Sequence, residues 1–347
     1  MARIAMNLPP APAATASRER KLLLAVDAPS LLHRNHHARA DTGLVDRGGR
    51  PAWALHGMLR QIIEAIEQFA PDAVIFGIDD RRSSVRETFY PEYKAGRAPK
   101  DADLVDQLER AGALLDALGM ATLTPPGLEA DDVNASAATW ARHNDWNCVI
   151  VTSDRDSFAH ISEHTQVLRL INGGMANSPL LNPSRLRALY GVDATNYLDF
   201  AALRGDASDN LPGVPGIGEK TAPILLEQMG SMAAVWADID HCGGETLVAA
   251  LDSWAAENGV RRLGTTLLKR LTAPGARERY EFNVKLMGGR DDLDLGLTPD
   301  VPGTPGLLPL EVDRVVRVLG HLNVPATTTM AMRVLTGAPA STAAHWD

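Results

Sequence analysis

Apolar residues in the first half of the chain follow two alternating patterns. Short continuous apolar runs, typical of strands buried in a parallel sheet, alternate with longer stretches in which apolar residues recur at helical spacing. The predicted helices lie at 53–69, at 104–118 and from Val133 onward, and the predicted strands lie at 21–27, 73–78, 120–123, 147–152 and 166–171. This alternation predicts an α/β fold with a doubly wound, mostly parallel sheet.

The pattern changes near residue 180. Beyond residue 183 the chain predicts short helices interrupted by Gly and Pro, which indicates a second, helical domain at 181–295. Residues 1–20 are rich in Ala and Pro without periodicity and predict a disordered tail. We expect a loop between the first predicted strand, at 21–27, and the first predicted helix, at 53–69. The segment 296–347 begins with a linker rich in Pro and Gly, resumes a helix near residue 310, and has no assigned role.

Cysteine content and hydropathy narrow the setting. The chain has two cysteines, Cys148 in an apolar run and Cys242 beside two glycines, so neither a disulfide framework nor a thiolate zinc site is expected. A reducing, cytoplasmic environment fits best. No apolar run reaches the ~20 residues that a membrane-spanning helix needs. The N-terminal segment also lacks the apolar core of a signal peptide, so we expect no membrane partner.

The formal net charge of −9 argues against a nucleic-acid partner until the charges are mapped along the chain. Residues 81–100 contain six Lys and Arg against two Glu, and residues 261–290 contain eight against two. The surplus of acidic residues is concentrated in clusters. Together these clusters contain nine carboxylates, whose summed charge equals the formal net charge of −9. Basic segments in a chain whose acidic residues are clustered are typical of a metal-dependent enzyme that acts on a polyanion.

The clustered acids follow predicted strands or occupy the first turn of a predicted helix. The carboxyl ends of parallel strands meet at one edge of a sheet, so these side chains should converge there. In chain order they are Asp27, Asp79, Glu129, Asp131, Asp132, Asp154, Asp156, Asp206 and Asp209. The last two come from the helical domain and, being three residues apart, would share one face of a helical turn.

Each acidic group alone has a structural explanation. Acids cap helix N-termini, and acids at strand ends begin loops or Asx turns. If all nine converge, however, their mutual repulsion requires cations, and all-oxygen ligation selects hard divalent ions such as Mg²⁺ or Mn²⁺. Their joint recurrence at strand ends therefore predicts a metal centre.

A glycine-bracketed turn at 213–222 is a candidate phosphate site. It precedes a predicted helix, so its backbone N–H groups and the charge of Lys220 suit a phosphate oxygen. The turn is not a P-loop, because Gly218 is followed by Glu219 rather than by lysine. An ordinary helix-turn-helix connection is the alternative explanation.

The basic segment 81–100 is a second candidate for phosphate contact. It contains Arg86 and the sequence Tyr93-Lys-Ala-Gly-Arg97, in which Lys94 and Arg97 would share one face if the segment became helical on binding. The alternative is a solvated, flexible loop.

In combination and in order, these motifs closely resemble the bacterial 5′ nucleases. This flap endonuclease or 5′-3′ exonuclease family also forms the N-terminal domain of many DNA polymerase I enzymes. The matching segments are LLLAVDA at 22–28, Asp79 with Arg86 and the 93–97 motif, GLEADD at 127–132, TSDRD at 152–156, GDASDNLPGV at 205–214 and GIGEKTA at 216–222.

The resemblance implies a PIN-like nuclease core at 21–180, with an arch at about 81–118 past which the 5′ strand runs, and a helix-hairpin-helix DNA-binding domain at 181–295 with a K⁺ ion in its hairpin. It implies two divalent cations, Mg²⁺ or Mn²⁺. The first metal site would comprise Asp27, Asp79, Glu129 and Asp131, and the second would comprise Asp132, Asp154, Asp156, Asp206 and Asp209.

The resemblance also assigns the basic residues. Lys94 and Arg97 match arch positions that contact the scissile phosphate, and Arg86 is a third catalytic candidate. The candidates for DNA contact are Arg34, Arg81, Arg82, Gly213, Gly216, Gly218, Lys220 and Thr221. The chain departs from the family pattern at Ala28, where Gly is usual, at His33, where another aromatic residue is usual, and in its charged run at 80–82.

These observations predict a stand-alone, monomeric, bacterial 5′ nuclease without a polymerase domain. It would hydrolyse DNA at 5′ flaps or 5′ ends, including RNA-primed ones, near junctions of single and double strands, in replication and repair. Two alternatives remain at this point: a PIN-type ribonuclease, which shares the metal chemistry but normally lacks the 213–222 hairpin, and a DNA-junction-binding protein without catalysis.

Overall fold

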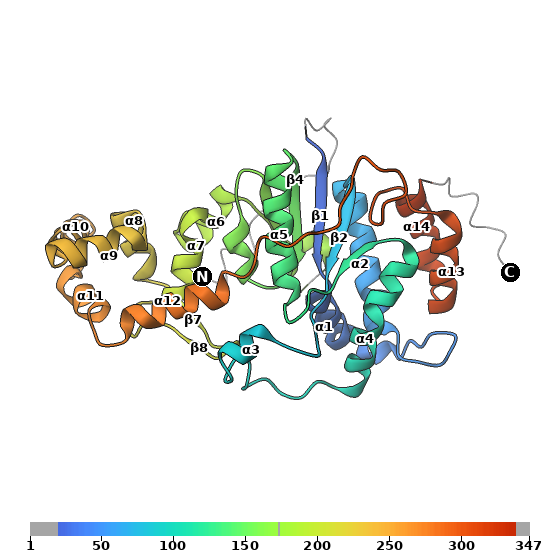
Figure 1. The fold of residues 1–347 in the computed structure, drawn as a ribbon, viewed down its shortest axis with the longest axis horizontal. Helices are drawn as coiled ribbons and strands as arrows, with labels where there is room; N and C mark the ends of the chain where they lie inside the picture. Colours follow the sequence, from blue (N-terminus) through green and yellow to red (C-terminus); the bar gives the residue numbers. More distant parts are fainter. Residues whose placement is uncertain (1–19, 173, 338–347) are drawn as a thin grey trace.

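A six-stranded sheet forms the centre of the larger domain (Figure 1). The computed structural model describes residues 20–172 and 174–337, so the predicted tail lies outside the described residues except for residue 20. The strand order is β3-β2-β1-β4-β5-β6, and all neighbours are parallel except β5 and β6. The strands are β1 (Leu22–Asp27), β2 (Ala73–Gly77), β3 (Ala121–Leu123), β4 (Asn147–Thr152), β5 (Thr165–Arg169) and β6 (Leu180–Leu181). The predicted doubly wound, mostly parallel sheet is confirmed.

Helices cover both faces of the sheet because its central strands are apolar on both sides. In β1, Leu23 and Ala25 face the core that includes α5, whereas Leu24 and Val26 face the core built with α1, α2 and α4. No helix in the described ranges is long and apolar enough to cross a membrane. The bounds of these helices are α1 (Ala28–Arg39), α2 (Trp53–Phe69), α4 (Ala102–Leu118) and α5 (Ala130–His143).

The loop predicted after the first strand is wrong, because residues 28–39 form helix α1. The Asp27 side chain caps the helix by accepting the Ser30 N–H at 2.9 Å, and Pro29 stands in the first turn, where proline is favoured. Leu31 and Leu32 are buried against the sheet. The remaining residues are mainly polar or histidine, which hid the helical periodicity.

The helical domain carries the predicted glycine-rich turn between two helices. A two-stranded hairpin, β7 (Gly205–Asp206) and β8 (Leu211–Pro212), lies between α7 and α8. Asp206 and Asp209 therefore belong to a β-hairpin and its turn, and the predicted helical turn is wrong. The helices of this part are α6 (Pro183–Tyr190), α7 (Tyr197–Arg204), α8 (Ala222–Met229), α9 (Met232–Cys242), α10 (Glu245–Glu257), α11 (Gly264–Leu271) and α12 (Ala276–Met287).

Glycine is required where the hairpin crosses the end of α7. A Cβ on Gly213 would lie 2.2 Å from the carbonyl oxygen of Arg204, and a Cβ on Gly205 would lie 2.2 Å from the Gly213 nitrogen. Both backbones therefore approach more closely than any side chain permits.

Only the first part of the predicted arch at 81–118 lies outside the helices that pack on the sheet. It contains the short helix α3 (Val85–Phe89) and a series of turns up to residue 97. Helix α4, by contrast, packs on α1 and α2. Its fully buried Gln107 accepts the backbone N–H of Ala54 at 2.8 Å. We therefore use "arch" below for residues 81–101 alone.

The C-terminal extension, which had no assigned role, completes the larger domain. The segment after α12 crosses in front of the sheet to reach α13 (Val312–Leu322) and α14 (Pro325–Thr336) at the end opposite the helical domain (Figure 1). On the way, the Gly306 carbonyl accepts the Val74 N–H at 2.9 Å. Helix α14 then packs on α2, and α13 packs on α4.

This packing predicts that the extension stabilises the sheet domain. Leu319 of α13 is 1% exposed within the core formed by α2 and α4. Leu319→Ala should lower the free energy of unfolding by about 2–5 kcal/mol, because it removes buried methyl groups and leaves a cavity. The measurement is urea unfolding, with Val312→Ala as the matched control, since Val312 lies on the same helix and is 41% exposed. An equal effect of both substitutions would show that α13 is not part of the core.

Candidate metal-dependent active site

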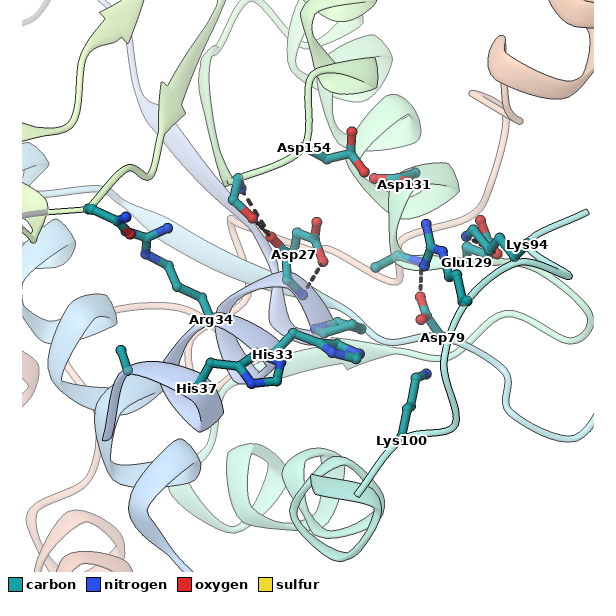
Figure 2. A pocket seen from close by; sticks show the side chains of 17 residues that line it. Asp27, His33, Arg34, His37, Asp79, Lys94, Lys100, Glu129, Asp131 and Asp154 are labelled. Atoms are coloured by element: carbon teal, nitrogen blue, oxygen red, sulfur yellow. Dashed lines mark hydrogen bonds and ion pairs between the residues drawn. The ribbon is translucent and has the colours of Figure 1, made fainter. Parts of the chain in front are cut away.

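Five of the nine clustered acids line one pocket at the carboxyl edge of the sheet. The pocket has a volume of about 590 Å³. Its acidic residues come from the ends of β1, β2 and β4 and from the start of α5, and they are Asp27, Asp79, Glu129, Asp131 and Asp154. Figure 2 shows Asp131 and Asp154 directed toward one another, with Asp27 beside them and Asp79 and Glu129 farther along the pocket.

Hydrogen bonds hold two of these carboxylates in fixed positions. Asp27 accepts the N–H of Ser30 and the hydroxyl of Thr152, the latter at 2.7 Å. Asp79 accepts the N–H of Ala130 at 2.9 Å, which ties the end of β2 to the start of α5. Each carboxylate keeps lone pairs directed elsewhere, and thus has capacity to bind a cation.

Burial and mutual repulsion make this cluster costly to ionise. Burial, together with the charges of Asp79 and Asp154, raises the pKa of Asp27 to about 7. Burial and Asp154 raise the pKa of Asp156 to about 8, and burial also raises the pKa of Asp131 well above its usual value. A cation placed among these groups would reverse the shifts.

Two buried oxygen atoms support the assignment of cations to this edge. Within the described residues, Oδ1 of Asp131 and Oδ1 of Asp156 are buried without a hydrogen-bond partner. Such orphaned acceptors are rare in folded proteins, and carboxylate oxygens are the ligands that hard divalent cations prefer. In the part of the chain that the structure describes, no group of three or more His, Cys, Asp or Glu side chains lies close enough together to hold a metal ion. Cation binding would therefore require these side chains to draw together.

The remaining predicted ligands from the second group lie beside Asp154 rather than in the pocket lining. After burial, the charges of Asp209 and Asp206 contribute most to the raised pKa of Asp154. Asp206 accepts both the N–H and the hydroxyl of Ser208 at 2.7 Å. The hairpin of the helical domain thus brings its two acids close to the carboxyl end of β4.

Asp132 is turned away from this cluster, which contradicts its predicted place among the metal ligands. It is 1% exposed and forms a two-pronged ion pair with Arg86, at 2.8 and 3.0 Å. It also accepts the backbone N–H groups of Glu129 and Arg290. Burial opposes ionisation, yet the Arg86 guanidinium and these N–H groups lower the pKa of Asp132.

Arg86 is correspondingly buried and held in this ion pair, so its guanidinium is directed mainly at Asp132 and not, as the predicted catalytic role requires, at the pocket acids. Its Nε donates to the Leu286 carbonyl at 3.2 Å, at the end of α12. The guanidinium thereby joins the arch, the first turn of α5 and the last turn of α12. Its contact with Glu129, at 3.4 Å, is its one ion pair with an acid of the pocket in the described structure.

The other arch residues contact the acidic cluster directly. Lys94 Nζ donates to Glu129 at 2.7 Å, and Arg97 forms an ion pair with Asp209. The backbone of Lys94 has a φ of 58°, which its N–H stabilises by donating to the Asp209 carbonyl at 3.1 Å. Tyr93, which sequence analysis did not select, is 6% exposed and donates to Asp209 at 2.8 Å.

The predicted phosphate-binding turn is only partly free. The Gly218 N–H donates to the Thr221 hydroxyl at 3.2 Å, and Arg270 of α11 donates to the Gly216 carbonyl at 2.6 Å. Within residues 20–172 and 174–337, the N–H groups of Gly216 and Lys220 have no protein acceptor. The Lys220 side chain is exposed.

Comparison with known proteins assigns this architecture to a family. Residues 22–191 match the model of the N-terminal resolvase-like domain of 5′-3′ exonucleases. Residues 192–272 match the model of the C-terminal SAM fold of the same enzymes, so the two models together cover well over half of the chain. The chain belongs to the 5′-3′ exonuclease family.

Relatives of this chain include bacterial DNA polymerases. It is 40% identical over 219 residues to the thermostable DNA polymerase I of Thermus aquaticus, covering 63% of this chain and 25% of the polymerase. It is 34% identical over 306 residues to that of Thermus thermophilus, covering 88% of this chain and 34% of the polymerase. The chain thus spans about a quarter to a third of the length of these relatives.

The fold of this chain also matches a solved structure. The T5 5′-exonuclease, determined with bound divalent metal ions, has 18% sequence identity and a TM-score of 0.58, covering 91% of this chain and all of the T5 chain. At this identity the match concerns the fold alone.

The sequence patterns do not predict one wall of the pocket. Helix α1 and the end of the arch contribute His33, His37 and Lys100, and Arg34 of α1 donates to Asn172 at 3.1 Å. The signal was present, because His33 and His37 are four residues apart and share a helical face. It was overlooked because 28–39 was assigned to a loop. The DNA-contact candidates Arg81 and Arg82 line a different pocket, on the outer side of Asp79.

The contrast between Asp132 and Asp154 gives a first test. Asp132→Asn should lower the free energy of unfolding by about 3–5 kcal/mol, because it leaves the Arg86 charge buried without its partner. Asp154→Asn should leave that free energy unchanged or raise it, because it relieves repulsion among acids. Urea unfolding without divalent ions measures both. If Asp132→Asn proves neutral and Asp154→Asn destabilising, the two assignments must be exchanged.

The raised pKa values give a second test. In the metal-free folded state Asp27 and Asp156 hold protons that the unfolded chain has lost above pH 4, so their contribution to stability falls as pH rises. Mg²⁺ must displace these protons. It should therefore raise the thermal unfolding midpoint more at pH 8 than at pH 6. Asp154→Asn should remove most of the shift, and an equal shift in that variant would indicate non-specific binding.

Proposed function

We propose that this 5′-3′ exonuclease is a structure-selective 5′ nuclease that hydrolyses DNA phosphodiesters near junctions of single and double strands. The observation that carries the proposal is the pocket itself. One side is made of carboxylates, among them Asp131 with an unpartnered buried oxygen, and an adjoining side is made of cations from the arch. This arrangement suits a phosphate group that arrives together with divalent ions.

The carboxylates fit two hard divalent cations, Mg²⁺ or Mn²⁺. Asp27, Asp79, Glu129 and Asp131 would hold the first ion. Asp154, Asp156, Asp206 and Asp209 would hold the second, with Asp132 excluded by its pairing with Arg86. When bound, such ions lower the pKa of a water and stabilise charge on the leaving 3′ oxygen.

The arch residues would position and neutralise the scissile phosphate. Lys94 and Arg97 now pair with Glu129 and Asp209. Cations bound by those acids would weaken both ion pairs and free the two basic side chains for the phosphate oxygens. Charge-assisted hydrogen bonds from them would then stabilise the negative charge that develops on the phosphate.

The helical domain would supply most of the DNA affinity. The turn at 213–222 offers the N–H groups of Gly216 and Lys220, and the segment 261–290 adds basic side chains. A K⁺ ion in the hairpin would add a further positive charge toward the backbone. Phosphate contacts of this kind release counterions, so affinity should fall steeply with salt. We propose that the protein acts as a monomer on flaps and 5′ ends, including RNA-primed ones.

Labelled 5′-flap DNA, incubated with Mg²⁺ or with EDTA, tests the function. Cleavage near the junction is expected only with Mg²⁺. Asp154→Asn should abolish cleavage while leaving junction binding measurable, whereas Lys220→Ala should weaken binding several-fold and preserve kcat at saturating DNA. A matched flap made of RNA serves as the comparison substrate. Binding without any cleavage would indicate a junction-binding protein, and cleavage of RNA alone would indicate a ribonuclease.

A further inference from the structure

The pocket has a second wall that the proposed chemistry does not use. Helix α1 contributes His33, Arg34 and His37 to it, and the end of the arch contributes Lys100. Figure 2 shows the three α1 side chains on one side of the pocket below Asp27, with Lys100 across from His33. These residues stand apart from Lys94 and Arg97, which face Glu129 and Asp209.

The charges on this wall lack compensation. Throughout residues 20–172 and 174–337, Arg34, His37 and Lys100 form no ion pair with a carboxylate. Among the described residues, the side chain of Arg34 donates one hydrogen bond, to the neutral amide of Asn172 at 3.1 Å. By contrast, Arg86, Lys94 and Arg97 each pair with an acid. The wall thus presents hydrogen-bond donors that have no carboxylate acceptor among the described residues.

Electrostatics within the wall agree with this description. Burial, followed by the charges of Lys100 and Arg97, lowers the pKa of His33 to about 4. At neutral pH, His33 is therefore an uncharged donor or acceptor next to cations. Burial lowers the pKa of Lys100; the charge of Asp79 opposes this shift, and the charges of Arg81, Arg97 and Lys94 add to it. An anion placed here would meet an excess of positive charge.

On the basis of the proposed function, we infer that this wall binds the phosphate next to the scissile one on its 5′ side. The wall consists of Arg34, His37 and Lys100, together with His33. The carboxylate side of the pocket receives the scissile phosphate, and the next phosphate of the same strand lies within the same pocket. The volume of about 590 Å³ falls within the range of about 300–1,000 Å³ typical of small-molecule sites, which is enough for a nucleotide.

The inference defines a substrate preference. At a nick, the phosphate next to the first scissile bond is the 5′-terminal phosphate. A nick that ends in a 5′-phosphate should therefore be a better substrate than one that ends in a 5′-hydroxyl. A flap supplies an internal phosphate at the same place, so its cleavage should not depend on the chemistry of its 5′ end.

The experiment pairs two nicked duplexes, identical except for a 5′-phosphate or a 5′-hydroxyl, with wild-type protein and variants. Release of the terminal nucleotide is followed with Mg²⁺, and equilibrium binding is followed by fluorescence anisotropy in EDTA. For wild type, kcat/KM on the phosphorylated nick should be about ten-fold higher or more, the size expected of hydrogen bonds between charged groups. Lys100→Ala and Arg34→Ala should remove this advantage, because they lower kcat/KM on the phosphorylated nick several-fold more than on the hydroxyl nick.

Arg47→Ala is the matched control, because Arg47 is an exposed basic residue outside the pocket, and it should leave both substrates unchanged. Equal rates of wild type on both nicks would overturn the inference, as would equal losses of the variants on both. If wild type cleaves no substrate, the proposed function fails. The anisotropy comparison then decides the inference alone, since the wall should still favour the phosphorylated nick.

Discussion

Repulsion among buried carboxylates is the constraint on which the rest of this structure depends. The parallel sheet brings the ends of β1, β2 and β4 to one edge, and each of these ends carries an aspartate. Protein groups offset only part of the resulting charge. From the arch, Lys94 pairs with Glu129 of the sheet domain and Arg97 pairs with Asp209 of the helical domain. Tyr93 adds a hydrogen bond to Asp209. The acids therefore determine where the arch lies, and the arch in turn links the hairpin to the sheet.

The pair formed by Arg86 and Asp132 provides a second link between the helical domain and the sheet domain. Its hydrogen bonds join the arch to the start of α5 and to the end of α12. Aromatic packing reinforces the same junction, since Phe89 stacks on Phe282 of α12 with centroids 5.4 Å apart. Helix α12 is thus mechanically connected to the turn that carries Glu129 and Asp131. Neutral side chains of similar size could fill this junction, but they would not fix its register as a two-pronged ion pair does.

Sequence predicted the sheet and most of the acidic pocket because both follow from local patterns. An apolar run that ends in aspartate is visible within seven residues, and parallel topology then places such ends together. Sequence could not separate Asp131 from Asp132. Neighbouring residues on a helix point in directions about 100° apart, so only one of them can face the pocket. The partners that turn Asp132 away lie 46 and 158 residues along the chain. Helix α1 was missed for a local reason, because its buried positions include Asn35 and His36 as well as leucines.

The order in which the chain is synthesised gives the C-terminal segment a further importance. The cores of α2 and α4 are covered by α13 and α14, and Val74 bonds to Gly306 across more than 230 positions. Such long-range contacts form late, after most of the chain has left the ribosome. Until then, the apolar outer surfaces of α2 and α4 remain exposed to other nascent chains and to chaperones. The helical domain is thus synthesised before the last layer of the sheet domain is in place.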